Sequence, residues 1–87
     1  MPNAPSIKVT VTFPLAHEPF HAEETSEKSI GAVRKDAMKF FGVSEDPGSV
    51  YYLSHDGVRE PDDRTVGDIA GHAHAVKFTL VKELIQG

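Results

Sequence analysis

The residues of this sequence that could do chemistry are histidines and carboxylates, and no cysteine accompanies them. His72 and His74 lie two positions apart, on the same side of an extended segment. They could share a metal ion with a third imidazole, that of His55 or His17. A metal site needs more ligands within reach, and loop histidines beside a glycine are usually solvated, so we predict no metal. The acidic pair at 62–63 is more typical of a turn than of catalysis.

The composition excludes several classes of function. Without cysteine there are no disulfides, no thiolate catalysis and no zinc–thiolate site. We find no glycine-rich phosphate loop, no nucleophile motif and no aromatic stripe interleaved with basic residues. The formal net charge of -4 argues against binding to nucleic acid or to an anionic membrane. We therefore expect no catalytic residues, no cofactor, and partners that are proteins.

Alternation predicts the first strand, over residues 7–13. Its apolar members are Ile7, Val9, Val11 and Phe13. The residues between them are lysine and threonine, which suits the exposed face of a half-buried strand. Pro14 and Pro19 interrupt this pattern, and a shorter alternating stretch follows at 20–23. We predict a hairpin.

An amphipathic helix is expected after the hairpin, packed on the sheet. Its apolar residues recur at three- and four-residue spacing and are Ile30, Val33, Ala37, Phe40 and Phe41. Ser29 is the expected N-cap, because its side-chain oxygen can accept a hydrogen bond from an amide of the first turn. Gly42 is the expected end of the helix.

A third strand is predicted at 50–53, where the β-propensity is high, and a turn signal follows at 55–57. We expect Tyr51 or Leu53 in the core and Tyr52 exposed as a candidate contact residue.

The remainder is predicted to be irregular from 58 to 71, apart from a helical turn at 65–69, and then to form a last strand at 75–81. In that strand the inward residues are Val76, Phe78 and Leu80, and the outward residues are Lys77 and Thr79.

This order of elements predicts a single α+β domain. If the first and last strands pair in parallel at the centre of a mixed sheet, one helix can cover its apolar face. We expect a lead-in at 1–6, the domain at 7–81 and a C-terminal tail at 82–87. No apolar run approaches the roughly 20 residues of a membrane span, and the first residues are too short and polar for a signal peptide. A cytoplasmic monomer is therefore expected.

The order of elements, together with the segment 63–69, resembles the ubiquitin family. In that family the segment before the last strand reads glycine, arginine, threonine, leucine, serine, aspartate. Arg64, Thr65 and Asp68 match it here, and Val66 is a conservative change. The resemblance covers residues 7–80 and implies a ubiquitin-like β-grasp, a mixed four- to five-stranded sheet with one main helix packed on one face. The same fold serves modifiers, sulfur carriers and adaptor modules.

The resemblance also gives the C-terminal residues a role. Modifiers of the family end in a flexible tail whose terminal glycine carboxylate is adenylated, passed to a cysteine and finally joined to an amine. The conjugation tail implied here consists of Leu84, Ile85, Gln86 and Gly87. The family's usual pair of terminal glycines is replaced by Gln86 and Gly87, which points to activating and conjugating enzymes other than the standard ones, such as the dedicated sets that many bacteria encode.

The family's apolar receptor-binding patch is also changed. The partner-binding surface expected here comprises Leu15, Tyr52, Ser54, Lys77 and Thr79. Of the positions that correspond to the patch itself, only Leu15 is still apolar, so general ubiquitin receptors are expected to bind poorly.

Three functions remain open at this point. The first is a ubiquitin-like modifier conjugated through Gly87. The second is a β-grasp module that binds a protein through its sheet face or helix without any covalent bond. The third is a sulfur carrier with a thiocarboxylate at Gly87. A modifier predicts a mobile chain from about Lys82 onward, whereas a binding module is free to pack Leu84 and Ile85 against the domain.

Overall fold

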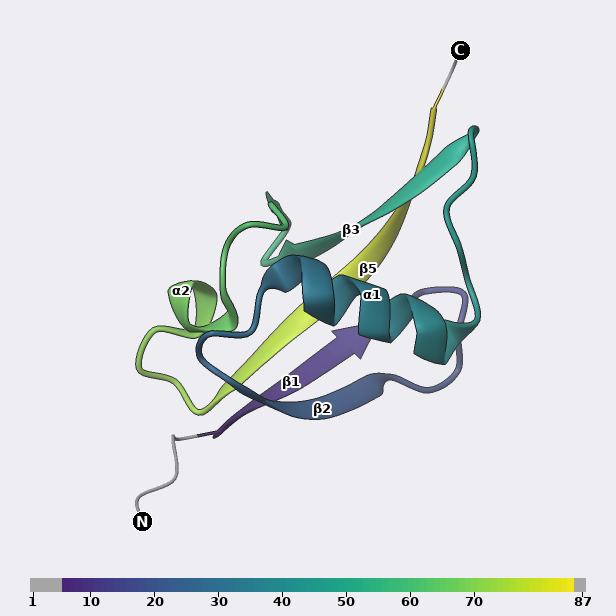
Figure 1. Cartoon of the computed structure of the whole chain (residues 1–87). Coiled ribbons are helices and arrows are strands. Elements are labelled where there is room, and N and C mark those ends of the chain that lie inside the picture. The colour runs from purple at the N-terminus through teal and green to yellow at the C-terminus, as the bar shows by residue number, and fades with distance from the viewer. Residues whose placement is uncertain (1–5, 86–87) are drawn as a thin grey trace.

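The computed structural model describes residues 6–85, which form a five-stranded sheet with two helices (Figure 1). In chain order the elements are β1 (Ser6–Thr12), β2 (Phe20–Thr25), α1 (Ile30–Phe41), β3 (Ser49–His55), β4 (Val58–Glu60), α2 (Val66–Ala70) and β5 (Ala75–Leu84). The strand order is β2-β1-β5-β3-β4. The expected α+β β-grasp fold is confirmed.

The first and last strands pair in parallel, as predicted, and every other neighbouring pair is antiparallel. In the parallel pair Val9 lies beside Val76, and Val11 lies beside Phe78. These side chains alternate with exposed ones, so each strand presents one apolar face. The helix α1 lies across that face in Figure 1.

The boundaries of α1 agree with those predicted. The Ser29 side chain accepts a hydrogen bond from the Ala32 amide at 3.1 Å. Gly42 ends the helix in the left-handed conformation, with φ of 72°, and its N–H reaches the carbonyls of the last turn. Glycine adopts this conformation at little cost because it has no Cβ.

One expectation about α1 is wrong. Phe40 does not pack under the sheet with Phe41: its side chain is 52% exposed, and Met38 is buried instead. Successive residues are about 100° apart around a helix, so Phe40 lies at the border of the apolar stripe. Its ring centre lies 5.5 Å from that of Phe20 in the edge strand β2.

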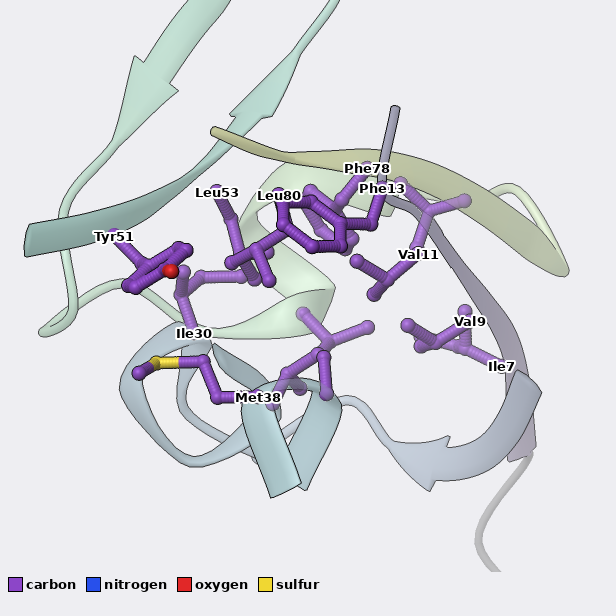
Figure 2. Close-up of a cluster of buried hydrophobic side chains, with 14 residues drawn as sticks. Ile7, Val9, Val11, Phe13, Ile30, Met38, Tyr51, Leu53, Phe78 and Leu80 are labelled. Atoms are coloured by element: carbon purple, nitrogen blue, oxygen red, sulfur yellow. The ribbon is translucent and has the colours of Figure 1, made fainter. Parts of the chain in front are cut away.

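A single cluster of fourteen buried side chains forms the core (Figure 2). Its members are Ile7, Val9, Val11, Phe13, Ile30, Val33, Ala37, Met38, Tyr51, Leu53, Val66, Val76, Phe78 and Leu80. Figure 2 shows Tyr51 at one end of the cluster and Ile7 and Val9 at the other. The sequence predicts that Tyr51 or Leu53 lies in the core, and both side chains are buried.

The strand β4 follows a two-residue turn. Asp56 and Gly57 both have positive φ, 51° and 82°, which suits the tight turn of a two-residue hairpin. The sequence predicts this turn but not the strand after it. Three residues are too few for alternation to stand out, and the last of them, Glu60, is a buried carboxylate that pairs with Arg64 at 2.9 Å.

The helix α2 begins with a capping box. The Asp68 amide donates to the Thr65 hydroxyl at 3.1 Å, and the Thr65 amide donates to the Asp68 carboxylate at 3.0 Å. The bond from the Thr65 amide and a second from its hydroxyl lower the pKa of Asp68. Gly67, the second residue of α2, lies so close to Ser26 that a Cβ on the glycine would be 2.7 Å from the Ser26 Cβ.

Arg34 ties α1 to two loops. Its guanidinium donates two hydrogen bonds to the Asp62 carboxylate, at 3.0 and 2.9 Å, and lies 3.4 Å from Glu45. The Asp62 hydrogen bond is the main cause of a raised pKa for Arg34. A two-pronged contact of this kind fixes orientation as well as distance, so it sets the helix relative to the segments before β3 and after β4.

Truncation of the core tests this packing. Leu53→Ala removes a fully buried side chain and should lower the free energy of unfolding by about 2–5 kcal/mol, measured by urea denaturation. The exposed Val58 provides a matched control, since Val58→Ala should cost less than about 0.5 kcal/mol. Equal effects of the two substitutions would contradict the core assignment.

The capping box predicts a dependence of stability on pH. The folded-state pKa of Asp68 is lowered, so its carboxylate stabilises the fold above its ordinary pKa of about 3.9. This contribution is lost as the pH falls through the folded-state pKa. Asp68→Asn should therefore lower the melting temperature at neutral pH, and the difference from wild type should shrink in acid. Asp63→Asn is the control, because residues 6–85 provide no hydrogen bond for the Asp63 side chain. If the effect of Asp68→Asn on the melting temperature did not change with pH, the stabilising role of the Asp68 carboxylate would be contradicted.

Candidate partner-binding surface and C-terminal segment

The sheet face opposite α1 carries most of the predicted partner-binding residues. Ser54 lies directly across from Thr79 in the β3–β5 pair, and Tyr52 lies across from Val81. Lys77, two residues before Thr79, shares its face and pairs with Thr10 of β1. The alternation of β3 and β5 thus brings Tyr52, Ser54, Lys77 and Thr79 together on one surface.

Leu15 lies apart from these strand positions. It belongs to the loop between β1 and β2, and its side chain is 79% exposed.

The open face of the sheet is polar near its centre. The Thr12 hydroxyl lies 3.4 Å from the Thr79 hydroxyl and 3.4 Å from the Phe78 carbonyl oxygen. These hydroxyls make the middle of the face polar, whereas Tyr52 and Val81 lie opposite each other further along the same face.

Tyr52 is more covered than predicted. Its side chain is half-buried, because the Arg59 guanidinium lies 4.5 Å from the centre of its ring. Arg59 also forms an ion pair with Glu83 at 3.3 Å. Sequence reasoning missed both residues, since Arg59 reaches Tyr52 only through the pairing of β4 with β3. Because the Arg59 side chain is largely exposed, this cation–π contact contributes about 0.5–1 kcal/mol.

The C-terminal segment is paired further than expected. Residues 82–84 continue β5 alongside 49–51 of β3, and the Ile85 amide donates to the Gly48 carbonyl at 2.9 Å. The side chains remain exposed, Leu84 at 71% and Ile85 at 48%. Figure 1 shows the paired ends of β3 and β5 leaving the domain as an arm that extends away from α1. Gln86 and Gly87 lie outside the described residues.

The loop before β3 covers the outer edge of this arm. The Glu45 carboxylate accepts a hydrogen bond from the Tyr51 amide at 3.0 Å. Asp46 accepts from the Gly48 amide at 2.8 Å and from the Ser49 hydroxyl at 3.0 Å, and the Gly48 bond is the main cause of a lowered pKa for Asp46. The Glu45 carboxylate thus occupies the Tyr51 amide, and the Asp46 backbone pairs with that of Ser49, so this chain itself covers the start of the outer edge.

The histidines of the loop before β5 are not gathered with other ligands. His72 and His74 are exposed in the loop between α2 and β5, where the His74 carbonyl accepts the Lys8 amide at 2.9 Å. Within residues 6–85, no group of three or more histidine, aspartate or glutamate side chains is placed to hold a metal ion. In the same part of the chain, neither helix has the length and apolar character needed to cross a bilayer.

Comparison with known proteins finds likeness in structure. No protein-family model matches the chain, and no curated protein matches its sequence. Ubiquitin of Caldiarchaeum subterraneum is similar with a TM-score of 0.74 and 22% identity, over 94% of this chain and 99% of that one. The N-terminal ubiquitin-like domain of the 4931431F19Rik protein gives 0.69 and 15%, over 100% and 84%. A structure from work on molecular mimicry of SUMO that promotes DNA repair gives 0.70 and 10%, over 91% and 94%. The fold is therefore that of ubiquitin and ubiquitin-like domains.

Hydrogen exchange tests the pairing of the arm. Because the Ile85 amide is hydrogen-bonded to Gly48, its exchange with solvent should be slower than that of exposed loop amides such as Glu18, measured by NMR in deuterated buffer. Equal exchange rates at Ile85 and Glu18 would show that the segment is unpaired in solution.

Proposed function

We propose that this ubiquitin-like protein is a modifier, activated and conjugated through the carboxylate of Gly87. The observation that supports the proposal is the β3–β5 arm, which carries the chain away from the core and displays Leu84 and Ile85 just before Gly87. An enzyme that handles a terminal carboxylate needs an extended, accessible segment leading to it. The apolar side chains of Leu84 and Ile85 are exposed for such an enzyme to bind.

The proposed chemistry takes place on enzymes, with the modifier as substrate. A Gly87 carboxylate oxygen attacks the α-phosphorus of ATP, displacing pyrophosphate and forming an acyl-adenylate. A cysteine thiolate of the activating enzyme then attacks the acyl carbon and displaces AMP. An amine of the target displaces the thiolate and loses a proton, leaving an amide. Glycine suits the acyl position because it has no side chain to hinder either attack.

Two departures from ubiquitin support enzymes dedicated to this protein. Gln86 puts a side chain where the family's penultimate residue is a glycine, so the enzyme channel must be wider there. The open sheet face presents Ser54, Lys77 and Thr79, so contacts with it are polar. Discrimination from ubiquitin would follow, because a site built for these polar groups leaves its own groups unpaired against an apolar patch.

A non-covalent binding module is the second candidate, favoured by a specific observation. The backbone is hydrogen-bonded as far as Ile85, which leaves two residues beyond the last described bond. The segment from Lys82 to Ile85, where a modifier predicts a mobile chain, is thus paired, and a modifier must release this end of β5 when an enzyme binds it. Strand ends open at low free-energy cost, so this requirement is compatible with conjugation. The sulfur carrier is the third candidate. It differs from the modifier only in the group that finally receives the Gly87 acyl group.

Intact-mass analysis separates these functions. The protein is incubated with ATP and the activating-type enzymes of its own organism, as wild type and as a chain lacking Gly87. The expected result is an enzyme thioester that depends on Gly87, since removal of Gly87 leaves the side chain of Gln86 at the acyl position. A thiocarboxylate mass would assign the sulfur carrier instead. Mass analysis of the protein isolated from its own cells reports whether Gly87 is the terminal residue there.

Gln86→Gly is the matched control for the fit of the tail. It should remain a substrate of the dedicated enzymes and become a better substrate of standard ubiquitin-activating enzymes. No Gly87-dependent adduct with enzymes shown to be active would exclude the modifier and leave the binding module.

A further inference from the structure

The end of β5 is held by few contacts. The pairing of β5 with β1 ends at Thr79, so beyond that residue β3 is the strand beside β5 within residues 6–85. The side chains of residues 82–84 are exposed, and Figure 1 shows this part of β5 leaving the region under α1. Burial of apolar area therefore adds little to this pairing, which depends on backbone hydrogen bonds and on side-chain contacts across the strands.

Arg59 of β4 makes such a contact with β5, although β3 lies between the two strands. The register places Arg59 opposite Ser54. Glu83 lies opposite Val50, four residues away along β3. Alternation puts these side chains on the open face of the sheet, with Tyr52 between them. The Arg59 guanidinium lies 4.5 Å from the centre of the Tyr52 ring and 3.3 Å from the Glu83 carboxylate, so the arginine spans β3 to reach β5.

The Tyr52 ring helps to position the guanidinium for this ion pair. A cation is favoured over the face of a tyrosine ring, so the contact with Tyr52 restricts the Arg59 side chain and lowers the entropy that it loses on pairing with Glu83. The two charged side chains are 58% and 49% exposed, so the pair is weak and is screened by salt. The contact can hold the strand end, and it can be broken at little cost.

A second anchor of the strand end lies in the loop before β3. The Ile85 amide donates to the Gly48 carbonyl at 2.9 Å. The Asp46 carboxylate accepts hydrogen bonds from the Gly48 amide and the Ser49 hydroxyl, so it fixes the residue that pairs with Ile85. The Gly48 bond is the main cause of the lowered pKa of Asp46, and the charge of Lys82 adds a small part. The end of β5 is thus held by this loop and by Arg59.

We propose that the contact of Arg59 with Glu83 is a latch, which sets how often the end of β5 is released from β3. With the latch closed, the segment 83–85 is paired. When the latch breaks, the strand end loses its side-chain anchor on the open face and opens while the core stays folded. The latch is a property of the folded chain and needs no enzyme. Only its consequence for conjugation rests on the function proposed above, because an enzyme channel binds the released segment before Gly87.

Amide hydrogen exchange of Ile85, measured by NMR on the full-length protein, reports the opening. Glu83→Gln and Arg59→Gln should each raise the exchange rate about two- to fivefold, the range that loss of an exposed ion pair allows. Glu23→Gln is the matched control, because Glu23 is an exposed strand carboxylate outside every ion pair of residues 6–85. Sodium chloride at about 1 M should raise the rate in wild type and have little effect in either latch variant.

A charge swap separates the latch from a general loss of stability. Arg59→Glu and Glu83→Arg should each raise the exchange rate of Ile85 more than neutralisation does, because each places like charges together. The two substitutions combined restore opposite charges, so the rate should return to within about twofold of wild type. Unchanged exchange in the single variants, or a double variant that exchanges as fast as they do, would overturn the proposal.

A disulfide lock tests whether conjugation needs the release. Ser49 and Leu84 lie directly opposite each other in the β3–β5 pair, and the chain has no cysteine, so Ser49→Cys with Leu84→Cys gives one bridge across the arm. The oxidised protein should not form the Gly87-dependent enzyme thioester, and the same protein reduced with a phosphine should form it. Equal rates for the two forms would overturn the role of release.

The latch and the modifier function fail separately. If active enzymes charge no form of the protein, the modifier is excluded, and the exchange rates of Ile85 still decide whether the latch exists. If the protein is charged but its exchange does not respond to Arg59 and Glu83, the latch is excluded and the modifier stands. If the disulfide variant failed to fold, Arg59→Gln would decide, since it should form the thioester about two- to fivefold faster than wild type at low protein concentration.

Discussion

Burial of one face of the sheet under a single helix is the constraint on which the other features of this domain depend. A chain of 87 residues has apolar side chains for one compact core, and the central parallel pair of β1 and β5 contributes inward residues to it on every second position. The opposite face must then meet solvent. Its polar residues, with Ser54 and Thr79 facing each other, are a direct consequence.

The same constraint explains why the arm exists. The helix α1 ends at Phe41, and the part of the sheet that it covers ends with it. The strand β5 continues beyond this part to Leu84. Beyond the helix the strands have backbone partners but no second layer, and Leu84 and Ile85 stay exposed although the backbone is paired. The carboxylates of Glu45 and Asp46 protect the outer edge of β3 in this region.

The three surfaces of the domain differ in the chemistry they offer. The open sheet face offers hydroxyls and the ammonium groups of Lys8 and Lys77. The arm offers aliphatic side chains on a strand end that can open. The end of α1 offers aromatic rings fixed to the core, with two lysines beside them. The arm and the C-terminal end of α1 lie on different elements of the domain.

The sequence by itself determined the features that depend on neighbours along the chain. These include α1 from its Ser29 cap to Gly42, the helical turn at α2, the alternation of the long strands and the buried face of the sheet. Only the tertiary structure decided β4, the length of β5, the Arg59 guanidinium over Tyr52 and the exposure of Phe40. Each of these depends on pairing between strands or elements: β4 and the Arg59 contact depend on the neighbouring β3, the end of β5 depends on the more distant β3, and the Phe40 ring lies beside Phe20 of the edge strand β2. Local propensity and periodicity carry no information on where such an edge will fall.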